Sequence, residues 1–149
     1  MNIKHHTHPD QLERYSFKWS EARLLIAAVA LFLGGYPPVL YLFPNFHDII
    51  RPFLNLSWII SGAASVYLLY RWHGGERNLF GGRNQKDTYA FFVSVVSGVN
   101  LGLTGILGQN IGMNIAYGNQ ILYIVTAAAY LWAAWHLWTR WKGHGERVF

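Results

Sequence analysis

The stretch Val93–Asn110, VSVVSGVNLGLTGILGQN, decides the fold of this chain because it lacks charge on every side and is rich in small residues. It holds four glycines and two serines. A surface helix of a soluble protein carries charged residues on one face, and this stretch carries none. It belongs to a run from Thr88 to Thr139 without Asp, Glu, Lys or Arg. Two further runs of this kind cover Leu24–Phe46 and Pro52–Tyr70, and a helix needs about 20 residues to cross a bilayer.

The composition agrees with a membrane environment. Of the 149 residues, 52% are hydrophobic and only 13% are charged, whereas about a quarter are charged in soluble proteins. The absence of cysteine excludes disulfides and thiolate metal sites. We therefore predict an integral membrane protein, with the lipid bilayer as its first partner and a bacterial or archaeal cytoplasmic membrane as its location.

The charge-free runs predict four helical spans. We place them at Arg23–Tyr41, Phe53–Arg71, Thr88–Leu107 and Asn119–Thr139, because the third run is too long for one span and divides at the glycine- and asparagine-rich stretch Gly108–Asn119. Helices are expected because an irregular backbone in lipid would leave peptide groups unpaired. The predicted fold is an all-α membrane protein with four transmembrane helices arranged as two tandem helical hairpins.

This prediction divides the chain into five parts. They are a cytoplasmic leader with a short amphipathic helix (1–22), a first hairpin (23–71), a cytoplasmic linker (72–87), a second hairpin (88–139) and a cytoplasmic tail (140–149).

The basic residues predict the orientation. Every Lys and Arg except Arg51 falls in the leader, the linker or the tail, or borders one of them as Arg23 and Arg71 do, so the positive-inside rule puts both termini in the cytoplasm. The net charge of +5 is then a signal of topology, and we expect no nucleic-acid partner.

The two halves share a pattern at an offset of 63 residues. Gly35 then falls on Gly98, and Trp72-His73 falls on Trp135-His136. The pattern indicates an internal repeat of two hairpins that point the same way, related by an axis along the membrane normal.

The second half also resembles a known family. The segment from DTYAFFVSVVSGVNLGLTGILGQNIG through QILYIVTAAAYLW is similar to the small two-helix bacterial membrane family typified by YuzA. Members carry a G-x-N-x-G segment in their first helix, matched here by Gly98, Asn100 and Gly102. In the first half, Tyr36 and Pro37-Pro38 stand in its place. The family is a domain of unknown function, so the resemblance implies a tandem, diverged fold and no activity.

The glycines of the opening stretch form a stripe for helix packing. Ser94, Gly98 and Gly102 recur every four residues, and Gly105 extends the flat surface. Such stripes let two helix backbones approach closely in lipid, and Asn100 would find its partner on another helix. The alternative is a pore lining, in which Asn100 and Thr104, also four residues apart, face the path of a solute.

The chemistry-bearing residues give weaker signals. The sequence has no HExxH, no phosphate-binding loop and no nucleophile elbow, so we predict no enzyme, no metal site and no cofactor. His73 and His136 each end the second helix of a repeat and could ligate a haem iron from opposite sides. The other interpretation is that both are amphipathic residues at the headgroup level.

These observations predict a non-catalytic membrane protein that works through helix packing, as a self-assembling scaffold, a homo-oligomer or an accessory subunit of a membrane complex. The alternative is a passive channel or facilitator for a small neutral or weakly polar solute. A haem-binding redox subunit is the third hypothesis.

Overall fold

The computed structural model describes residues 9–149 and contains four long helices and three short ones. The long helices are α2 (Pro9–Phe32), α4 (His47–Gly74), α5 (Gln85–Leu107) and α7 (Gln120–Gly143). The short ones are α3 (Pro38–Leu42), the 3₁₀ helix η1 (Pro44–Phe46) and α6 (Ile111–Ile115). The all-α class predicted from the sequence is confirmed.

Asparagine side chains start the helices of the second half. Asn84 accepts a hydrogen bond from the backbone of Lys86 at the start of α5, and Asn119 does the same for Leu122 at the start of α7. These bonds pair backbone donors that the first helical turn leaves free. Helix α5 ends at Leu107 and is capped by Gly108, whose φ of 71° is a left-handed conformation that glycine adopts without strain.

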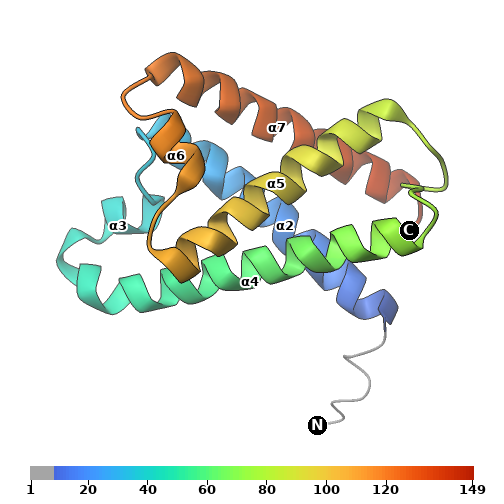
Figure 1. The fold of residues 1–149 in the computed structure, drawn as a ribbon, viewed down its shortest axis with the longest axis horizontal. Coiled ribbons are helices and arrows are strands. Elements are labelled where there is room, and N and C mark those ends of the chain that lie inside the picture. Colours follow the sequence, from blue (N-terminus) through green and yellow to red (C-terminus); the bar gives the residue numbers. More distant parts are fainter. Residues whose placement is uncertain (1–8) are drawn as a thin grey trace, which may run out of the picture.

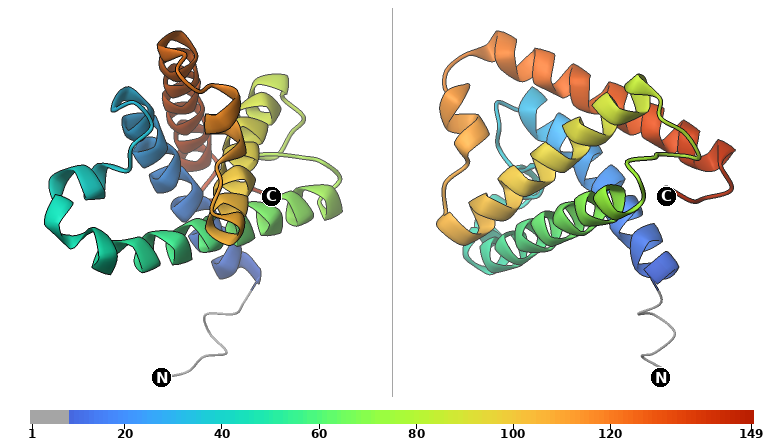
Figure 2. Two further views of the ribbon diagram at one scale, coloured as in Figure 1. Left: turned by 60° about the vertical axis from the view of Figure 1, so that its left-hand side comes forward. Right: turned by 45° about the vertical axis from the view of Figure 1, so that its right-hand side comes forward.

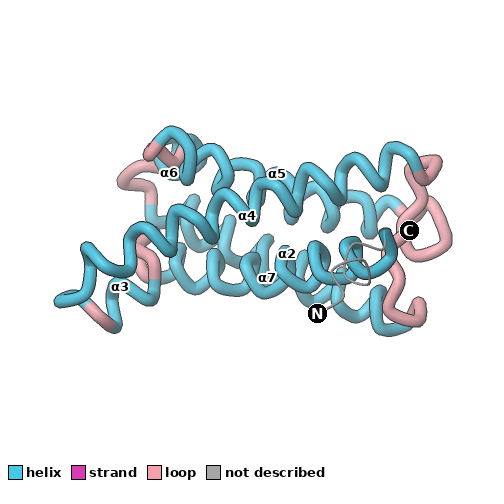
Figure 3. Tube along the Cα trace, turned by 90° about the horizontal axis from the view of Figure 1, so that it is seen from below, coloured by secondary structure: helices cyan, strands magenta, loops and turns pink. Residues whose placement is uncertain are grey.

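The long helices form two layers (Figure 3). Helix α4 packs mainly against α5 in one layer, and α2 packs mainly against α7 in the other. Helices α5 and α7 also contact each other, as do α2 and α4 (Figures 1 and 2). The predicted pairing into two tandem hairpins is therefore wrong, because the closest partner of α4 follows it across the linker and the closest partner of α2 comes from the other half of the chain.

The prediction of four transmembrane helices is also wrong. Among residues 9–149, three helical segments are long and apolar enough to cross a membrane: Pro44–Gly74, Gln85–Leu107 and Gln120–Gly143. They correspond to the predicted spans Phe53–Arg71, Thr88–Leu107 and Asn119–Thr139.

The first predicted span, Arg23–Tyr41, is not one helix. Helix α2 ends at Phe32, and the chain then turns through Gly34 and Gly35, whose φ angles are 76° and 86°. Helix α3 restarts only at Pro38. The apolar part of α2 after Arg23 is too short to cross a bilayer, and the first part is charged. Its charged residues are Asp10, Glu13, Arg14, Lys18, Glu21 and Arg23.

Most of the apolar surface of the three segments faces outward. Only 28%, 44% and 22% of their most apolar windows are buried inside the protein, in the order α4, α5, α7. Large side chains such as Phe53, Val96 and Ile121 are exposed there. A soluble monomer does not present this much contiguous apolar surface to water, so the outer faces suit a lipid environment.

The start of α2, the linker between α4 and α5 and the last residues of the chain lie together at one end of the bundle (Figure 3). We call it the basic end, after Arg14, Lys18, Arg71, Arg77, Arg83, Lys86, Arg140, Lys142 and Arg147. An aromatic core fills it. Phe17 of α2 contacts Phe80 of the linker and Trp141 of α7 with ring centroids 6.3 and 5.3 Å apart.

Glu13 ties three segments together at the basic end. Its carboxylate forms an ion pair with Arg71 of α4 at 2.7 Å. The other carboxylate oxygen accepts hydrogen bonds from the backbone nitrogens of Val148 and Phe149. The basic end is therefore closed by packed rings and by buried polar bonds.

Candidate functional site

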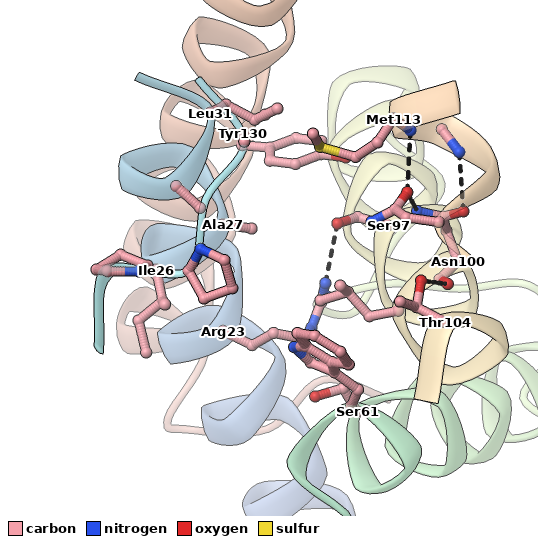
Figure 4. A pocket seen from close by; sticks show the side chains of 18 of the residues that line it. Arg23, Ile26, Ala27, Leu31, Ser61, Ser97, Asn100, Thr104, Met113 and Tyr130 are labelled. Atoms are coloured by element: carbon pink, nitrogen blue, oxygen red, sulfur yellow. Dashed lines mark hydrogen bonds between the residues drawn. The ribbon is translucent and has the colours of Figure 1, made fainter. Parts of the chain in front are cut away.

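A cavity of about 620 Å³ lies between the helices, on the side of the basic end's aromatic core that faces α3 and α6 (Figure 4). All four long helices contribute to its wall, together with α3, α6 and the turn after α2. Ile26, Leu31, Val39, Leu101 and Met113 are among its apolar residues. The surface of the wall is mainly apolar, and the residues that bring polar side-chain groups to it are Trp19, Arg23, Ser57, Trp58, Ser61, Ser97, Asn100, Thr104, Asn110, Tyr123, Thr126 and Tyr130.

Arg23 is the charged group of this wall. Its side chain crosses from α2 to α5, where Nη1 donates to Ser97 Oγ at 3.0 Å (Figure 4). Nη2 donates to the carbonyl of Ser94 at 2.8 Å. Arg23 is only 6% exposed. Both acceptors are neutral, so the guanidinium charge is held by hydrogen bonds without a carboxylate at ion-pair distance among residues 9–149.

Two consecutive hydrogen bonds connect α2 to α4 beside Arg23. Trp19 Nε1 donates to Ser61 Oγ at 2.9 Å, and Ser61 Oγ donates to the carbonyl of Ser57 at 2.7 Å. Since hydroxyl and indole groups in an apolar region need partners, these bonds fix the side chains that border the cavity.

Asn100 and Thr104 both line the cavity. Asn100 Nδ2 donates to Asn110 Oδ1 at 2.8 Å, and Asn100 Oδ1 accepts from the backbone nitrogen of Gly112 at 3.1 Å. Thr104 Oγ1 donates to the carbonyl of Asn100 at 2.8 Å. The partners of Asn100 thus belong to the start of α6, so this residue fixes α6 against the end of α5.

The glycine stripe of α5 faces α4. A Cβ added to Gly98 would lie 1.9 Å from Ser65 Oγ, and one added to Gly105 would lie 2.8 Å from the carbonyl oxygen of Asn55. Gly102 faces Gly62. Ser94 is buried and accepts a hydrogen bond from Arg23. The stripe is therefore occupied by helix packing within the chain.

The two histidines considered as haem ligands have different surroundings. His73 is exposed near the end of α4. His136 Nε2 lies 2.7 Å from Asp87 Oδ1, and its ring stacks on Trp132 with centroids 5.6 Å apart. Because Asp87 engages Nε2, that nitrogen is not free for an iron ion in this arrangement. The contacts of the two side chains give no support to a shared haem.

Asp87 was not among the candidate residues from the sequence. It is fully buried and also accepts from Arg140 Nε at 3.0 Å. A carboxylate at the start of a helix looks like an ordinary exposed first-turn residue in a sequence, and only the packing of α7 on α5 buries it. No cluster of three or more His, Cys, Asp or Glu side chains suited to a metal ion occurs among residues 9–149.

Sequence reasoning also missed Arg23 as a site residue, since it was taken as the boundary of a span. The signal was present as a spacing: Glu13, Ser16, Ser20, Glu21 and Arg23 place polar residues at helical intervals before the apolar run. Such a spacing predicts a helix that begins well before Arg23 and carries polar residues on one face. That this face is buried follows only from the packing of α2 in the bundle.

No protein-family model matches this chain, and no solved structure matches its fold. The geometry of the cavity and its lining residues is therefore the feature of this chain that indicates a function.

Proposed function

We propose that this chain is a non-catalytic integral membrane protein that binds a small, mainly apolar molecule in the cavity between its helices. The cavity itself carries this proposal. Sites for small molecules are concave, mainly apolar and about 300–1,000 Å³ in volume, with a few polar groups that orient the ligand. A cavity of about 620 Å³ with Arg23, Asn100 and Thr104 in its wall has these properties.

The position of the core favours binding or facilitated passage over an open channel. Phe91, Leu137 and Trp141 are buried in the packed core of the basic end. This core closes the basic end of the bundle, so a solute that entered the cavity would pass through only if the helices moved apart. Asn100 and Thr104 would then contact a bound molecule as it rests in the cavity.

The scaffold interpretation receives less support from the contacts. It depended on a small-residue stripe that is free to pack against a neighbouring protein. Gly98, Gly102 and Gly105 instead contact α4. Self-association, if it occurs, would need another surface.

Filling the cavity tests the proposal. Ala27 lines the cavity, whereas Ala128 lies on the exposed face of α7, so Ala27→Phe and Ala128→Phe are the same change at an inner and an outer position. Each variant is placed in nanodiscs of phosphatidylcholine and equilibrated with radiolabelled 1-decanol. Empty nanodiscs give the amount that dissolves in lipid.

We expect about one saturable decanol per chain above this background for the unchanged protein and for Ala128→Phe, and none for Ala27→Phe. Circular dichroism would establish that both variants retain the helical fold. Uptake equal to that of empty discs, or equal uptake by the two folded variants, would contradict a binding cavity.

A further inference from the structure

The wall of the cavity has the positive charge of Arg23 and, as far as residues 9–149 are concerned, no negative charge. No Asp or Glu is among the residues that line it in the part of the chain described, 9–149, and Arg23 is its only charged residue there. Building on the binding function proposed above, we infer that the natural ligand is an amphipathic anion, with a carboxylate or phosphate head beside Arg23 and a hydrocarbon body along the apolar wall.

The energetic argument begins with the burial of Arg23. Moving a charged side chain out of water is costly unless it is paired with an opposite charge. The guanidinium of Arg23 has hydrogen bonds to Ser94 and Ser97, but these acceptors carry no charge, and its Nε donates to none of the groups within 9–149. Some of the N–H groups of the Arg23 guanidinium therefore have hydrogen-bond acceptors, but its positive charge is not paired with a negative charge within 9–149.

Glu21 is the internal group that could supply this compensation. It lies two residues before Arg23 on α2, close enough for an electrostatic interaction. Two residues on a helix point about 200° apart, so their side chains do not meet directly. Both carboxylate oxygens of Glu21 are buried without a hydrogen-bond partner in the region 9–149. Glu21 thus does not form the close pair that Arg23 lacks.

The anionic head of a ligand would supply the negative charge that Arg23 lacks at close range. Arginine binds carboxylate and phosphate groups through charge-assisted hydrogen bonds, which are about twice as strong as neutral ones. The hydrogen bonds that Arg23 donates to Ser97 (Figure 4) and to the carbonyl of Ser94 already hold the guanidinium in place, so little conformational freedom would be lost when a ligand binds.

The rest of the wall suits a hydrocarbon body. Ala27, Leu31 and Met113 extend the cavity from Arg23 toward α6. Since each buried CH₂ gains about 0.8 kcal/mol from leaving water, an alkyl chain along this wall would be favourable when the ligand comes from water. A ligand already dissolved in lipid gains little from the same contacts, so the head group would decide its preference for the cavity.

A matched pair of ligands distinguishes the contribution of the anionic head to binding from that of the hydrocarbon body. Decanoate and 1-decanol have the same chain length and differ in charge at pH 8. Binding of each to the protein in phosphatidylcholine nanodiscs is measured after correction for uptake by empty discs. The variants are Arg23→Gln, which removes the charge and retains polar N–H groups, and Arg51→Gln, which removes the same charge at an exposed position outside the cavity.

We expect the unchanged protein and Arg51→Gln to bind decanoate at least tenfold more tightly than decanol. Arg23→Gln should bind the two equally and keep its affinity for decanol. Equal affinities in the unchanged protein would overturn the inference, as would a preference for decanoate that survives in Arg23→Gln. Failure of the unchanged protein to bind either compound would instead refute the binding function itself.

If Arg23→Gln does not fold, the comparison of decanoate with decanol on the unchanged protein still tests the inference. A second arm distinguishes the source of the anion, because dioctanoyl phosphatidylglycerol has a phosphate head and decanoate a free carboxylate. Tighter binding of the phospholipid identifies a lipid head group, and tighter binding of decanoate identifies a free amphipathic acid. An affinity for both no greater than that for decanol contradicts an anionic ligand.

Discussion

Gly62 of α4 and Gly102 of α5 lie so close that a Cβ added to either would be 2.6 Å from the Cα of the other. A real Cβ does not approach another atom so closely, so both positions require glycine at this separation of the two helices. Small residues bring helix backbones together in membranes, where packing replaces the hydrophobic effect between helices. This crossing holds α4 and α5 as one layer and fixes the wall of the cavity beside Ser97 and Thr104.

Gly102→Ala should therefore destabilise the protein. The added methyl group must push the two backbones apart, and overpacking of this kind costs about 1–3 kcal/mol. Thermal unfolding in a mild detergent, followed by tryptophan fluorescence, measures the loss. Gly74→Ala is the control because a Cβ at Gly74 meets nothing within 4 Å. Equal midpoints for the two variants would show that the crossing is not tightly packed.

Asp87→Asn should weaken the contact between α5 and α7. The substitution keeps the shape of the side chain but removes the charge that Arg140 and His136 contact. We expect a loss of about 1–3 kcal/mol, since Arg140 is partly exposed and water can replace part of the interaction. Asp48→Asn at a fully exposed position is the matched control. Chemical denaturation compares the two, and a loss no larger than that of the control would refute a stabilising role for Asp87.

Asn100→Leu should release α6 while leaving the long helices intact. The change removes the bonds to Asn110 and to the backbone of Gly112, each worth about 1 kcal/mol. Hydrogen exchange of the peptide containing Ile111–Ile115 should become faster, while exchange in α5 stays unchanged. Asn114→Leu is the control, because Asn114 is exposed on α6. Unchanged protection of α6 in Asn100→Leu would show that Asn100 does not hold it.

Acid should weaken one contact at the basic end. A hydrogen bond from Lys142, supported by the charge of Arg14, lowers the pKa of Glu146 in the folded protein. A carboxyl group with a lowered folded pKa stabilises the protein above its unfolded pKa and loses this contribution as the pH falls through the folded value. Glu146→Gln should thus lower the unfolding midpoint at pH 7, and the difference should shrink on acidification below about pH 4.

The ion pairs of Glu146 lie at the protein surface, where salt screens charges. At pH 7, 0.5 M salt should therefore also reduce the difference in unfolding midpoint between Glu146→Gln and the unchanged protein. Glu76→Gln, at another exposed glutamate, is the control. A difference between Glu146→Gln and the unchanged protein that persists through acidification would rule out the ion pair as its cause.

The sequence was sufficient to predict an all-α chain and the apolar character of α4, α5 and α7. Their charge-free runs are long, and a run of that length has few other stable structures in lipid. The close-packing spacing of Gly98, Gly102 and Gly105 was also legible from the residues. Its partner was not, because a stripe of small residues does not specify which helix packs on it.

The first half of the chain differs from its prediction for a physical reason. Hydropathy alone joins Leu24 to Tyr41, but Gly34, Gly35 and Pro37 interrupt the backbone. The polar start of α2 has the pattern of a separate leader, because charged residues seldom lie inside a helical bundle. Arg23 and Glu21 are buried here nonetheless, and the burial of each depends on α2 packing in the bundle rather than on local sequence. The arrangement in two tandem hairpins that the repeat implied is wrong, since α2 packs mainly against α7 and α4 against α5, whereas the family resemblance remains a prediction.

The most direct test of the central proposal is to locate a bound ligand. A decanoic acid with a photoreactive diazirine near its terminal methyl group is bound to the protein in nanodiscs, irradiated and mapped by peptide mass spectrometry. The proposal predicts labelling of cavity residues such as Leu31 and Met113, suppressed by excess unlabelled decanoate and by Ala27→Phe. Labelling confined to exposed residues such as Phe53 and Ile121, unaffected by competitor, would contradict a binding cavity.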